Sequence, residues 1–421
     1  MSISGQDFLN MYDLGERIQE QLIIDSTDPY ESKQPRYYSV NEAAKLIGIS
    51  HTYARKQLNL DEDPIPSHKI DGQIFLTLEQ VNKMRSRVNI NAGRLEHPGS
   101  DCQVLIVGNQ KGGSAKSTTT LHLGQGLVQK GLSVLIVDAD MQATLTESHA
   151  IKADQEIDDS STLIGAFYEP DNDVFYDDGG FESWDIRKTI KTTSWDKLHL
   201  LPANQFLYEV DNAIALNIRN YGLRGEVYPY FKRVRDELDK LRPFYDVILI
   251  DSPPNLGLFA TTLLYSADSM INTFQPTIND MLSTFRYWHL VGSILETTKK
   301  EYGFLRLLFT LDETDRVLPT AQKDENNPLK GKQSIEILRS IVRANFPDKC
   351  MQSTFKRSAA IGKTGALLNT VYEVHPSHYQ GSRATLKKAI EMSNEVVNEV
   401  FVLLNEVWAE QSAESGSVRA G

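Results

Sequence analysis

The sequence predicts an α/β fold in which a mostly parallel sheet is flanked by helices. Short runs rich in Val, Ile and Leu recur after residue 101, helical stretches separate them, and polar residues follow several of the runs. Continuous apolar runs of this length are typical of strands that are buried on both faces of a parallel sheet. The expected strands cover residues 104–108, 134–138, 247–251, 269–274 and 304–310. Because ligands bind at the carboxyl ends of such strands, the polar residues there are the first candidates for a functional site.

The composition is that of an ordinary globular protein of two or three domains. The chain has 421 residues, of which 40% are hydrophobic and 24% are charged. It has no apolar run of about 18 residues, and its first residues lack the basic and apolar segments of a signal peptide. Two cysteines, Cys102 and Cys350, offer no disulfide framework and no metal cluster. We therefore expect a cytoplasmic protein with no membrane role.

The net charge of −12 does not exclude a nucleic-acid partner, because binding depends on local basic patches. Acidic residues concentrate in residues 154–182, which we expect to form a solvated surface insertion. Basic residues cluster in residues 83–94 and 349–363.

Changes in pattern divide the chain into five parts. Residues 5–24 place apolar side chains at helical spacing and predict an amphipathic helix. A stretch rich in Gly, Asn and Pro makes a plausible linker further on. The predicted parts are an N-terminal helical arm that is a candidate for dimerisation (1–30), a small domain (37–88), the linker (89–100), the α/β domain (101–411) and a disordered tail (412–421).

The small domain reads as a winged helix-turn-helix. In YYSVNEAAKLIGISHTYARKQL, an apolar-patterned first helix ends at Gly48, and Ser50 caps a second helix. The following HKIDGQIFLTLEQV predicts a two-stranded wing with a turn at Asp-Gly. Such a second helix can enter the major groove of DNA, and the alternative is a helical protein-binding module. The DNA-contact candidates are Ser50, His51, Thr52, Arg55 and Lys56.

The stretch GNQKGGSAKSTTT, residues 108–120, leads from the first apolar run into a helix. Strand, Gly-containing loop and helix in this order form the context of a phosphate loop, in which backbone N–H groups cradle phosphate oxygens. Lys116 supplies a charge for the β- and γ-phosphates of ATP, and the Ser117 hydroxyl can ligate Mg²⁺. The alternative is a tight turn with solvated lysines. The expected nucleotide-binding residues are Lys111, Gly112, Gly113, Ser114, Ala115, Lys116, Ser117 and Thr118.

Three features separate this loop from the pattern G-x-x-x-x-G-K-[ST], and the first is Gln110, which stands where that pattern has its first glycine. Ala115 stands where that pattern has its second glycine, and alanine is tolerable there if the position needs a small residue at negative φ. An additional lysine, Lys111, stands at the entrance of the loop. It is poorly placed for its own nucleotide but could reach a phosphate bound by a facing subunit.

Another apolar run ends in an acidic residue. In FYDVILIDSPPNLG, Asp251 closes the strand and two prolines stiffen the turn. A carboxylate at the tip of a buried strand is suited to hold a Mg²⁺-bound water in a dry site.

KGGSAKST resembles the deviant phosphate loop KGGxxK[ST] of the ParA/MinD family of dimerising ATPases. VLIVDADMQATLT and ILIDSPPN are similar to the second and third motifs of that family. The resemblance implies that Lys111 acts across the dimer and Lys116 within its own subunit. It further implies that Asp138 lies near the Mg²⁺ shell with Asp251, and that Asp140 orients the attacking water.

The order of a helix-turn-helix before an ATPase resembles the longer ParA proteins of partition systems, over nearly the whole chain. The resemblance implies a slow, Mg²⁺-dependent ATP hydrolase that forms a homodimer with ATP and then binds non-specific DNA. A ParB-like centromere-binding protein and DNA would stimulate hydrolysis, and the ADP state would bind operator DNA and repress the operon. We expect such a protein to be nucleoid-associated.

The non-specific DNA surface is expected to include basic residues of the last quarter of the chain, for which the alternative is a solvated basic face. The candidates are Lys356, Arg357, Lys363, Arg383 and Lys387.

Other functions of this fold remain open or are disfavoured. A nitrogenase-like reductase needs cluster-binding cysteines, and MinD needs a basic amphipathic helix at its end, whereas this tail is acidic on its polar side. The alternatives that remain are a nucleotide-switched transcriptional regulator and a replication or positioning ATPase.

Overall fold

The computed structural model describes residues 36–60, 63–70, 72–90, 92–175, 180–312 and 332–420, together with Gln6, Asn10, Met11, Leu14 and Lys33. Most of the predicted N-terminal helical arm (1–30) lies outside the described residues. No helix among the described residues is both long enough and apolar enough to cross a membrane.

The centre of the molecule is an eight-stranded sheet with the strand order β11-β10-β9-β4-β8-β5-β7-β6. Every neighbouring pair is parallel except β6 and β7. The mostly parallel α/β fold is confirmed, and the five predicted strands are present. The strands are β4 (Gln103–Gly108), β5 (Val134–Asp138), β6 (Lys191–Thr192), β7 (Leu198–Leu201), β8 (Val247–Asp251), β9 (Ser269–Phe274), β10 (Leu305–Asp312) and β11 (Cys350–Lys356).

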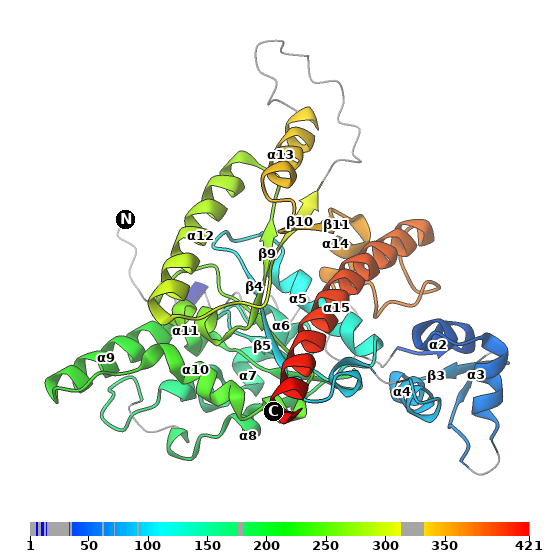
Figure 1. Ribbon diagram of the computed structural model, residues 1–421, viewed down its shortest axis with the longest axis horizontal. Coiled ribbons are helices and arrows are strands. Elements are labelled where there is room, and N and C mark those ends of the chain that lie inside the picture. The colour runs from blue at the N-terminus through cyan, green and yellow to red at the C-terminus, as the bar shows by residue number, and fades with distance from the viewer. Residues whose placement is uncertain are drawn as a thin grey trace.

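Helices cover both faces of the sheet (Figure 1). Leu105 and Val107 of β4 share a core with α5 and α15, whereas Val104 and Ile106 point into the core beneath α10 and α11. This alternation follows from the two-residue period of a strand. The helices of this domain are α5 (Lys116–Gln129), α6 (Thr144–Glu147), α7 (Ala153–Glu156), α8 (Ile186–Thr189), α9 (Val210–Leu223), α10 (Tyr230–Asp239), α11 (Leu258–Ser266), α12 (Ile278–Thr298), α13 (Lys332–Asn345), α14 (Ala359–Gly365) and α15 (Arg383–Ala420).

Among the described residues, six short 3₁₀ turns lie between the larger elements. They are η1 (Gly93–Glu96), η2 (Asp159–Ser161), η3 (Leu163–Phe167), η4 (Phe181–Ser183), η5 (Gln205–Glu209) and η6 (Arg242–Phe244).

Two expectations about exposed segments were wrong. The acidic stretch 154–182 is not a purely solvated insertion, because its apolar residues Leu163, Phe167 and Phe181 are buried against the sheet. Residues 412–420, predicted as a disordered tail, continue helix α15. The hydroxyl of Ser412 in this last part donates a hydrogen bond of 2.8 Å to the carbonyl of Pro98, which ties it to the linker.

The N-terminal module, residues 36–90, stands beside the α/β domain (Figure 1). Its short strands form an antiparallel sheet in the order β1-β3-β2. Gly48 (φ +84°) ends α2, and the Ser50 hydroxyl accepts a hydrogen bond from the Tyr53 N–H at the start of α3. Gly48 thus ends the first helix and Ser50 caps the second, as the sequence predicted. DNA binding by the module stays a prediction. The elements are β1 (Tyr38–Ser39), α2 (Val40–Ile47), α3 (His51–Leu58), β2 (His68–Ile70), β3 (Gln73–Leu76) and α4 (Leu78–Arg87).

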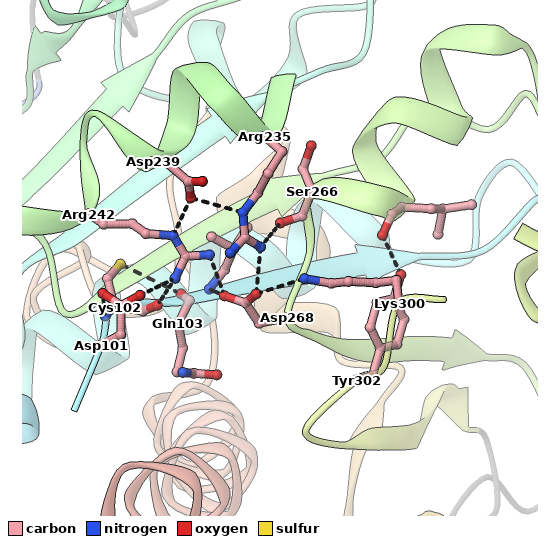
Figure 2. A network of polar contacts seen from close by, with 12 residues as sticks. Asp101, Cys102, Gln103, Arg235, Asp239, Arg242, Ser266, Asp268, Lys300 and Tyr302 are labelled. Atoms are coloured by element: carbon pink, nitrogen blue, oxygen red, sulfur yellow. Dashed lines mark hydrogen bonds and ion pairs between the residues drawn. The ribbon is translucent and has the colours of Figure 1, made fainter. Parts of the chain in front are cut away.

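A charged network fastens the sheet at the amino ends of β4 and β9 (Figure 2). Asp268 accepts from Arg235 at 2.7 Å, from Arg242 at 2.6 Å and from Lys300 at 3.1 Å. Its second oxygen also accepts from the Val104 N–H at 3.0 Å. The network therefore joins α10, η6 and the segment after α12 to the amino ends of two central strands, opposite the end at which the loop of residues 109–115 lies.

Candidate functional site

The glycine-containing loop joins β4 to α5 and is held from below by two neighbouring strands. Gly112 and Gly113 are exposed, whereas Ser114 is fully buried. The hydroxyl of Thr273 in β9 donates to the Ser114 hydroxyl at 3.1 Å, and the hydroxyl of Thr310 in β10 donates to the Ser114 carbonyl at 3.0 Å. The loop is thus fixed at its centre and open to solvent at its glycines.

Ala115 has a conformation that the sequence did not predict. Its φ is +63°, in the left-handed region, so the condition of a negative φ, under which alanine would be tolerable, is not met. Alanine in this region costs roughly 1–2 kcal/mol, because its Cβ approaches the following carbonyl. The tight passage from the loop into α5 requires this turn, and glycine would adopt it without that cost.

The two lysines of the loop have different surroundings. Lys116 is 6% exposed, and its ammonium group donates to the carbonyl of Lys111 at 3.3 Å. Burial lowers the pKa of Lys116, although Asp251, Asp140 and Asp280 act in the opposite direction. The Lys111 side chain is 36% exposed, and its ammonium nitrogen lies 3.4 Å from a carboxylate oxygen of Asp280 on α12. One lysine therefore lies beneath the loop, and the other lies at its outer edge.

Two buried carboxylates stand side by side at the ends of adjacent strands. Asp138 of β5 and Asp251 of β8 are partners in the strand register, and both are fully buried. Burial raises the pKa of Asp138 to about 6, against the hydrogen bonds from Thr146. Burial and the neighbouring Asp138 also raise the pKa of Asp251. Two carboxylates held this closely in a dry site favour a cation between or beside them.

The donor set fits Mg²⁺. One oxygen of Asp138 accepts from both the N–H (2.9 Å) and the hydroxyl (2.8 Å) of Thr146. Asp251 accepts from the Thr120 hydroxyl at 3.2 Å, but its Oδ2 has no hydrogen-bond partner among the described residues. A buried carboxylate oxygen without a donor is suited to a Mg²⁺-bound water. Ser117, at the start of α5, lowers the pKa of Asp251 and could ligate the ion through its hydroxyl.

Asp140 lies two residues beyond β5 and is partly exposed. One of its oxygens accepts from the Gln142 N–H at 3.1 Å. Its side chain is therefore held at the strand end but keeps access to solvent, as a water-orienting carboxylate needs.

A cavity of about 490 Å³ adjoins the start of α5. Its walls include both polar residues of the loop end and apolar residues of α5, β11 and α14. The main lining residues are Ser117, Thr118, Leu121, Phe355, Arg357 and Ile361.

The predicted DNA-contact residues of the N-terminal module share a surface. His51, Thr52, Arg55 and Lys56 are all exposed on α3, while Ala54 and Leu58 face the module core. The capping Ser50 lies at the exposed start of the same helix. The structure thus presents these side chains on one accessible helix.

The other basic candidates are divided between two places. Lys356 and Arg357, at the end of β11, line the cavity beside the loop rather than a remote face. Lys363 on α14 donates to the Gln380 carbonyl at 3.3 Å. Arg383 and Lys387 are exposed at the start of α15, where Lys387 lies 3.7 Å from Glu391. The structure does not bring these five residues together in one cluster.

Sequence reasoning missed several residues that hold the loop in place. Asn109 is buried, accepts from the Lys111 N–H at 3.1 Å, and donates to the Thr273 carbonyl at 2.5 Å. Gln275 donates to the Gly113 carbonyl at 2.6 Å. Both Thr273 and Gln275 lie where β9 ends, so attention to polar residues at every strand end, rather than to carboxylates alone, would have found them.

Comparisons with known proteins agree with this arrangement. Residues 102–302 match the family model described as an AAA domain. The chain is 28% identical to the putative replication protein A of Sinorhizobium fredii (strain NBRC 101917 / NGR234), over 90% of this chain and 89% of that protein. It is 29% identical to the chromosome partitioning protein ParA of Myxococcus xanthus (strain DK1622), over 56% of this chain and 74% of that protein.

A solved structure described as a partition protein shares the fold. It aligns with 87% of this chain and 97% of its own length, with a TM-score of 0.56 and 17% sequence identity. At this identity the likeness speaks for the fold alone.

Proposed function

We propose that this chain, a ParA-type ATPase, uses cycles of ATP binding and hydrolysis to control its own dimerisation and its hold on DNA in a partition system. One observation carries the proposal: the loop contains two lysines, of which Lys116 is buried beneath it and Lys111 extends along its outer edge. A nucleotide held within one subunit needs only the first. The second has a use if another subunit presents a phosphate.

The first lysine and the strand-end carboxylates would hold ATP with Mg²⁺. Gly112 and Gly113 are exposed, so phosphate oxygens can approach their N–H groups. Ser117 and Asp251 would hold the ion directly or through water, and Asp138 completes this shell. The bound Mg²⁺ would neutralise charge on the phosphates. The cavity of about 490 Å³ beside Ser117 and Thr118 would accept the base and the ribose.

Hydrolysis would be completed by residues of both subunits. Asp140 would orient a water for attack on the γ-phosphate, since it lies at the strand end and is accessible to solvent. Lys111 of the facing subunit would stabilise the developing charge on the phosphate. A site that lacks this second lysine would hydrolyse ATP slowly, and this would tie turnover to dimerisation.

The DNA-binding steps would follow from the nucleotide state. In the ATP dimer, basic residues such as Arg383 and Lys387 would contact phosphates without sequence preference, an interaction that weakens with salt. A ParB-like centromere-binding protein would stimulate hydrolysis and so release the dimer. In the ADP state, Arg55 and Lys56 of the exposed helix α3 would help to bind operator DNA and repress the operon.

A replication-linked role is a second candidate, because one relative that matches 90% of this chain is described as a putative replication protein A. Both roles use the same ATP-dependent dimer. They differ in the cargo, so loss of the gene would lower plasmid copy number in the replication case and impair only inheritance in the partition case.

The dimer step is tested by measuring the mass of the protein in solution with no nucleotide, with ADP and with ATP plus Mg²⁺. Asp140→Ala should trap the ATP-bound state, because it removes the water-orienting carboxylate and leaves the lysines in place. We expect a dimer of this variant with ATP and a monomer, or a weaker dimer, without it. The same mass in all three conditions would contradict the proposal.

A further inference from the structure

The joint between the N-terminal module and the α/β domain combines a shared apolar core with cavities. Two cavities, of about 220 Å³ and 320 Å³, flank Arg36 and Tyr38 where the module meets the larger domain. Asn82 of α4 makes a single contact across the joint, to Asp196 at 2.8 Å. A joint of this kind can shift as a unit unless a specific interaction fixes it.

A second specific interaction across the joint is made by Arg85 of α4, which is 5% exposed. One terminal nitrogen of its guanidinium group donates to the carbonyl of Gln129 at 2.8 Å and to the carbonyl of Leu46 at 3.2 Å. The other donates to the side chain of Asn82. Gln129 is the last residue of α5 and Leu46 lies in the last turn of α2, so one guanidinium group bonds to the carboxyl-terminal ends of two helices from different domains.

This charge is compensated by helix ends rather than by an acid. No ion pair of Arg85 is found among the described residues, and burial lowers its pKa to about 10. The last carbonyls of a helix have no intrahelical donor and carry partial negative charge. A buried cation that depends on two such ends would lose much of its stabilisation if either helix moved away.

The backbone beside Arg85 is shaped to admit it. Gly131, two residues after the end of α5, has φ +100°, which disfavours any other residue. A Cβ at this position would stand 2.7 Å from a terminal nitrogen of Arg85. The close contact and the positive φ together show that the end of α5 is built around the guanidinium group.

We propose that Arg85 couples the nucleotide-binding helix α5 to the N-terminal module. The inference rests on the proposed function, in which nucleotide binds at the amino-terminal end of α5. A displacement or stiffening of α5 on nucleotide binding changes the position of its last carbonyls. Arg85 passes the change to the end of α2, against which α3 packs, and so alters the presentation of His51, Arg55 and Lys56.

The test is hydrogen exchange on the full-length protein with no nucleotide, with ADP and with ATP plus Mg²⁺. Nucleotide should slow exchange in residues 112–118 and change it in residues 40–58. Allosteric couplings are typically about 5- to 150-fold, so we expect the exchange protection of residues 40–58 to change at least about fivefold. In Arg85→Met the change in the loop should persist and the change in the module should disappear.

Arg87→Met is the matched control. Arg87 is on the same helix, but its hydrogen bonds go to Gln57 and Asp63 within the module. This variant should transmit the nucleotide signal as the unmodified protein does. Arg85→Lys keeps the charge but loses the planar fork, so it should transmit only part of the signal, and it serves if Arg85→Met does not fold.

The hydrogen-exchange results distinguish failure of the coupling through Arg85 from failure of the proposed function. A nucleotide effect in residues 40–58 that survives in Arg85→Met would overturn the coupling. So would an effect in residues 112–118 of the unmodified protein with none in residues 40–58, and both results would leave the proposed ATPase intact. The absence of any nucleotide effect in residues 112–118 would overturn the proposed function and the coupling together.

Discussion

The ammonium nitrogen of Lys111 lies 3.4 Å from a carboxylate oxygen of Asp280, which is fully buried at the start of α12. The lysine that would act on a facing subunit is therefore held by its own chain. To reach another subunit's phosphate it must leave this carboxylate. Formation of the proposed dimer would therefore compete with an intramolecular ion pair.

Lys111→Ala should separate nucleotide binding from dimerisation. The variant keeps Lys116 and the loop backbone, so we expect ATP affinity within about threefold of normal, as for loss of a contact worth less than ~1 kcal/mol. ATP-dependent dimerisation should be lost. Nucleotide fluorescence titration and the mass in solution measure the two effects, and a normal ATP dimer of this variant would remove Lys111 from the proposed role.

Asp280→Asn should have the opposite effect. It weakens the hold on Lys111 but keeps an oxygen that can accept the hydrogen bond from the Gln275 N–H, now 2.6 Å long. Because Lys111 is partly exposed, we expect a gain on the order of 1 kcal/mol, or about a fivefold lower concentration for ATP-dependent dimerisation. A weaker dimer would mean that Asp280 positions Lys111 for its partner rather than restraining it.

Lys116→Ala and Asp140→Ala should fail at different steps. Lys116→Ala removes the buried charge beneath the loop, so nucleotide binding should be lost. Asp140→Ala should bind ATP normally and lose turnover by about 100-fold or more, as is typical when a positioned catalytic group is removed. Phosphate release and nucleotide titration measure the difference, and normal turnover in Asp140→Ala would place the attacking water on another carboxylate.

Ala115→Gly should preserve nucleotide binding and stabilise the fold slightly. Glycine removes the cost of a positive φ at the observed +63°, but it also gives the unfolded chain more freedom. We expect the free energy of unfolding to rise by up to about 1 kcal/mol. Ala115→Val, which adds β-branching at the same φ, should instead destabilise the protein, and urea unfolding would detect both changes. If both variants were less stable than the unmodified protein, the inference that Ala115 is strained by its positive φ would be wrong.

Asp268→Asn should lower the free energy of unfolding by an amount that depends on pH. Although burial raises the pKa of Asp268, the neighbouring Arg242, Arg235 and Lys300 lower it below its usual value. A depressed pKa contributes stability above the unfolded value of about 3.9, and this contribution is lost as the pH falls through the folded value. We expect Asp268→Asn to lose about 3 kcal/mol at pH 7 and the difference from the unmodified protein to shrink below pH ~4.

The control for this change is Asp239→Asn, since Asp239 pairs with Arg235 and Arg242 in the same network but is 44% exposed. We expect it to cost less than about 1 kcal/mol. Urea unfolding at pH 7 and at about pH 3, below the unfolded pKa of an aspartate, compares the two variants. A difference for Asp268→Asn that grew as the pH fell would contradict the account.

Buried parallel strands could be predicted from sequence because their apolar residues are continuous. The runs that end at Gly108, Asp138 and Asp251 have this form, and all three end at the site. Strand β11 was missed because Gln352 and Ser353 interrupt it. Their N–H groups are both bonded at 2.8 Å to Glu399 of α15, a partner that no local pattern reveals.

The residues that hold the loop in place could not be predicted from the sequence around the loop. Ser114 is held by Thr273 and Thr310, which are more than 150 residues away in sequence. The left-handed conformation of Ala115 is set by the same loop geometry rather than by its own preference. Motif spacing thus supports a prediction of the residues that would touch a nucleotide, but it does not reveal those that fix their positions.

The central claim, that nucleotide controls the hold on DNA, is tested most directly by binding to a random DNA duplex. The duplex is titrated with the protein in the absence of nucleotide, with ADP and with ATP plus Mg²⁺, at two salt concentrations. We expect strong binding only with ATP, and a steep loss of affinity at the higher salt because phosphate contacts release counterions. Equal binding in all three nucleotide states would contradict the claim and favour a transcriptional regulator.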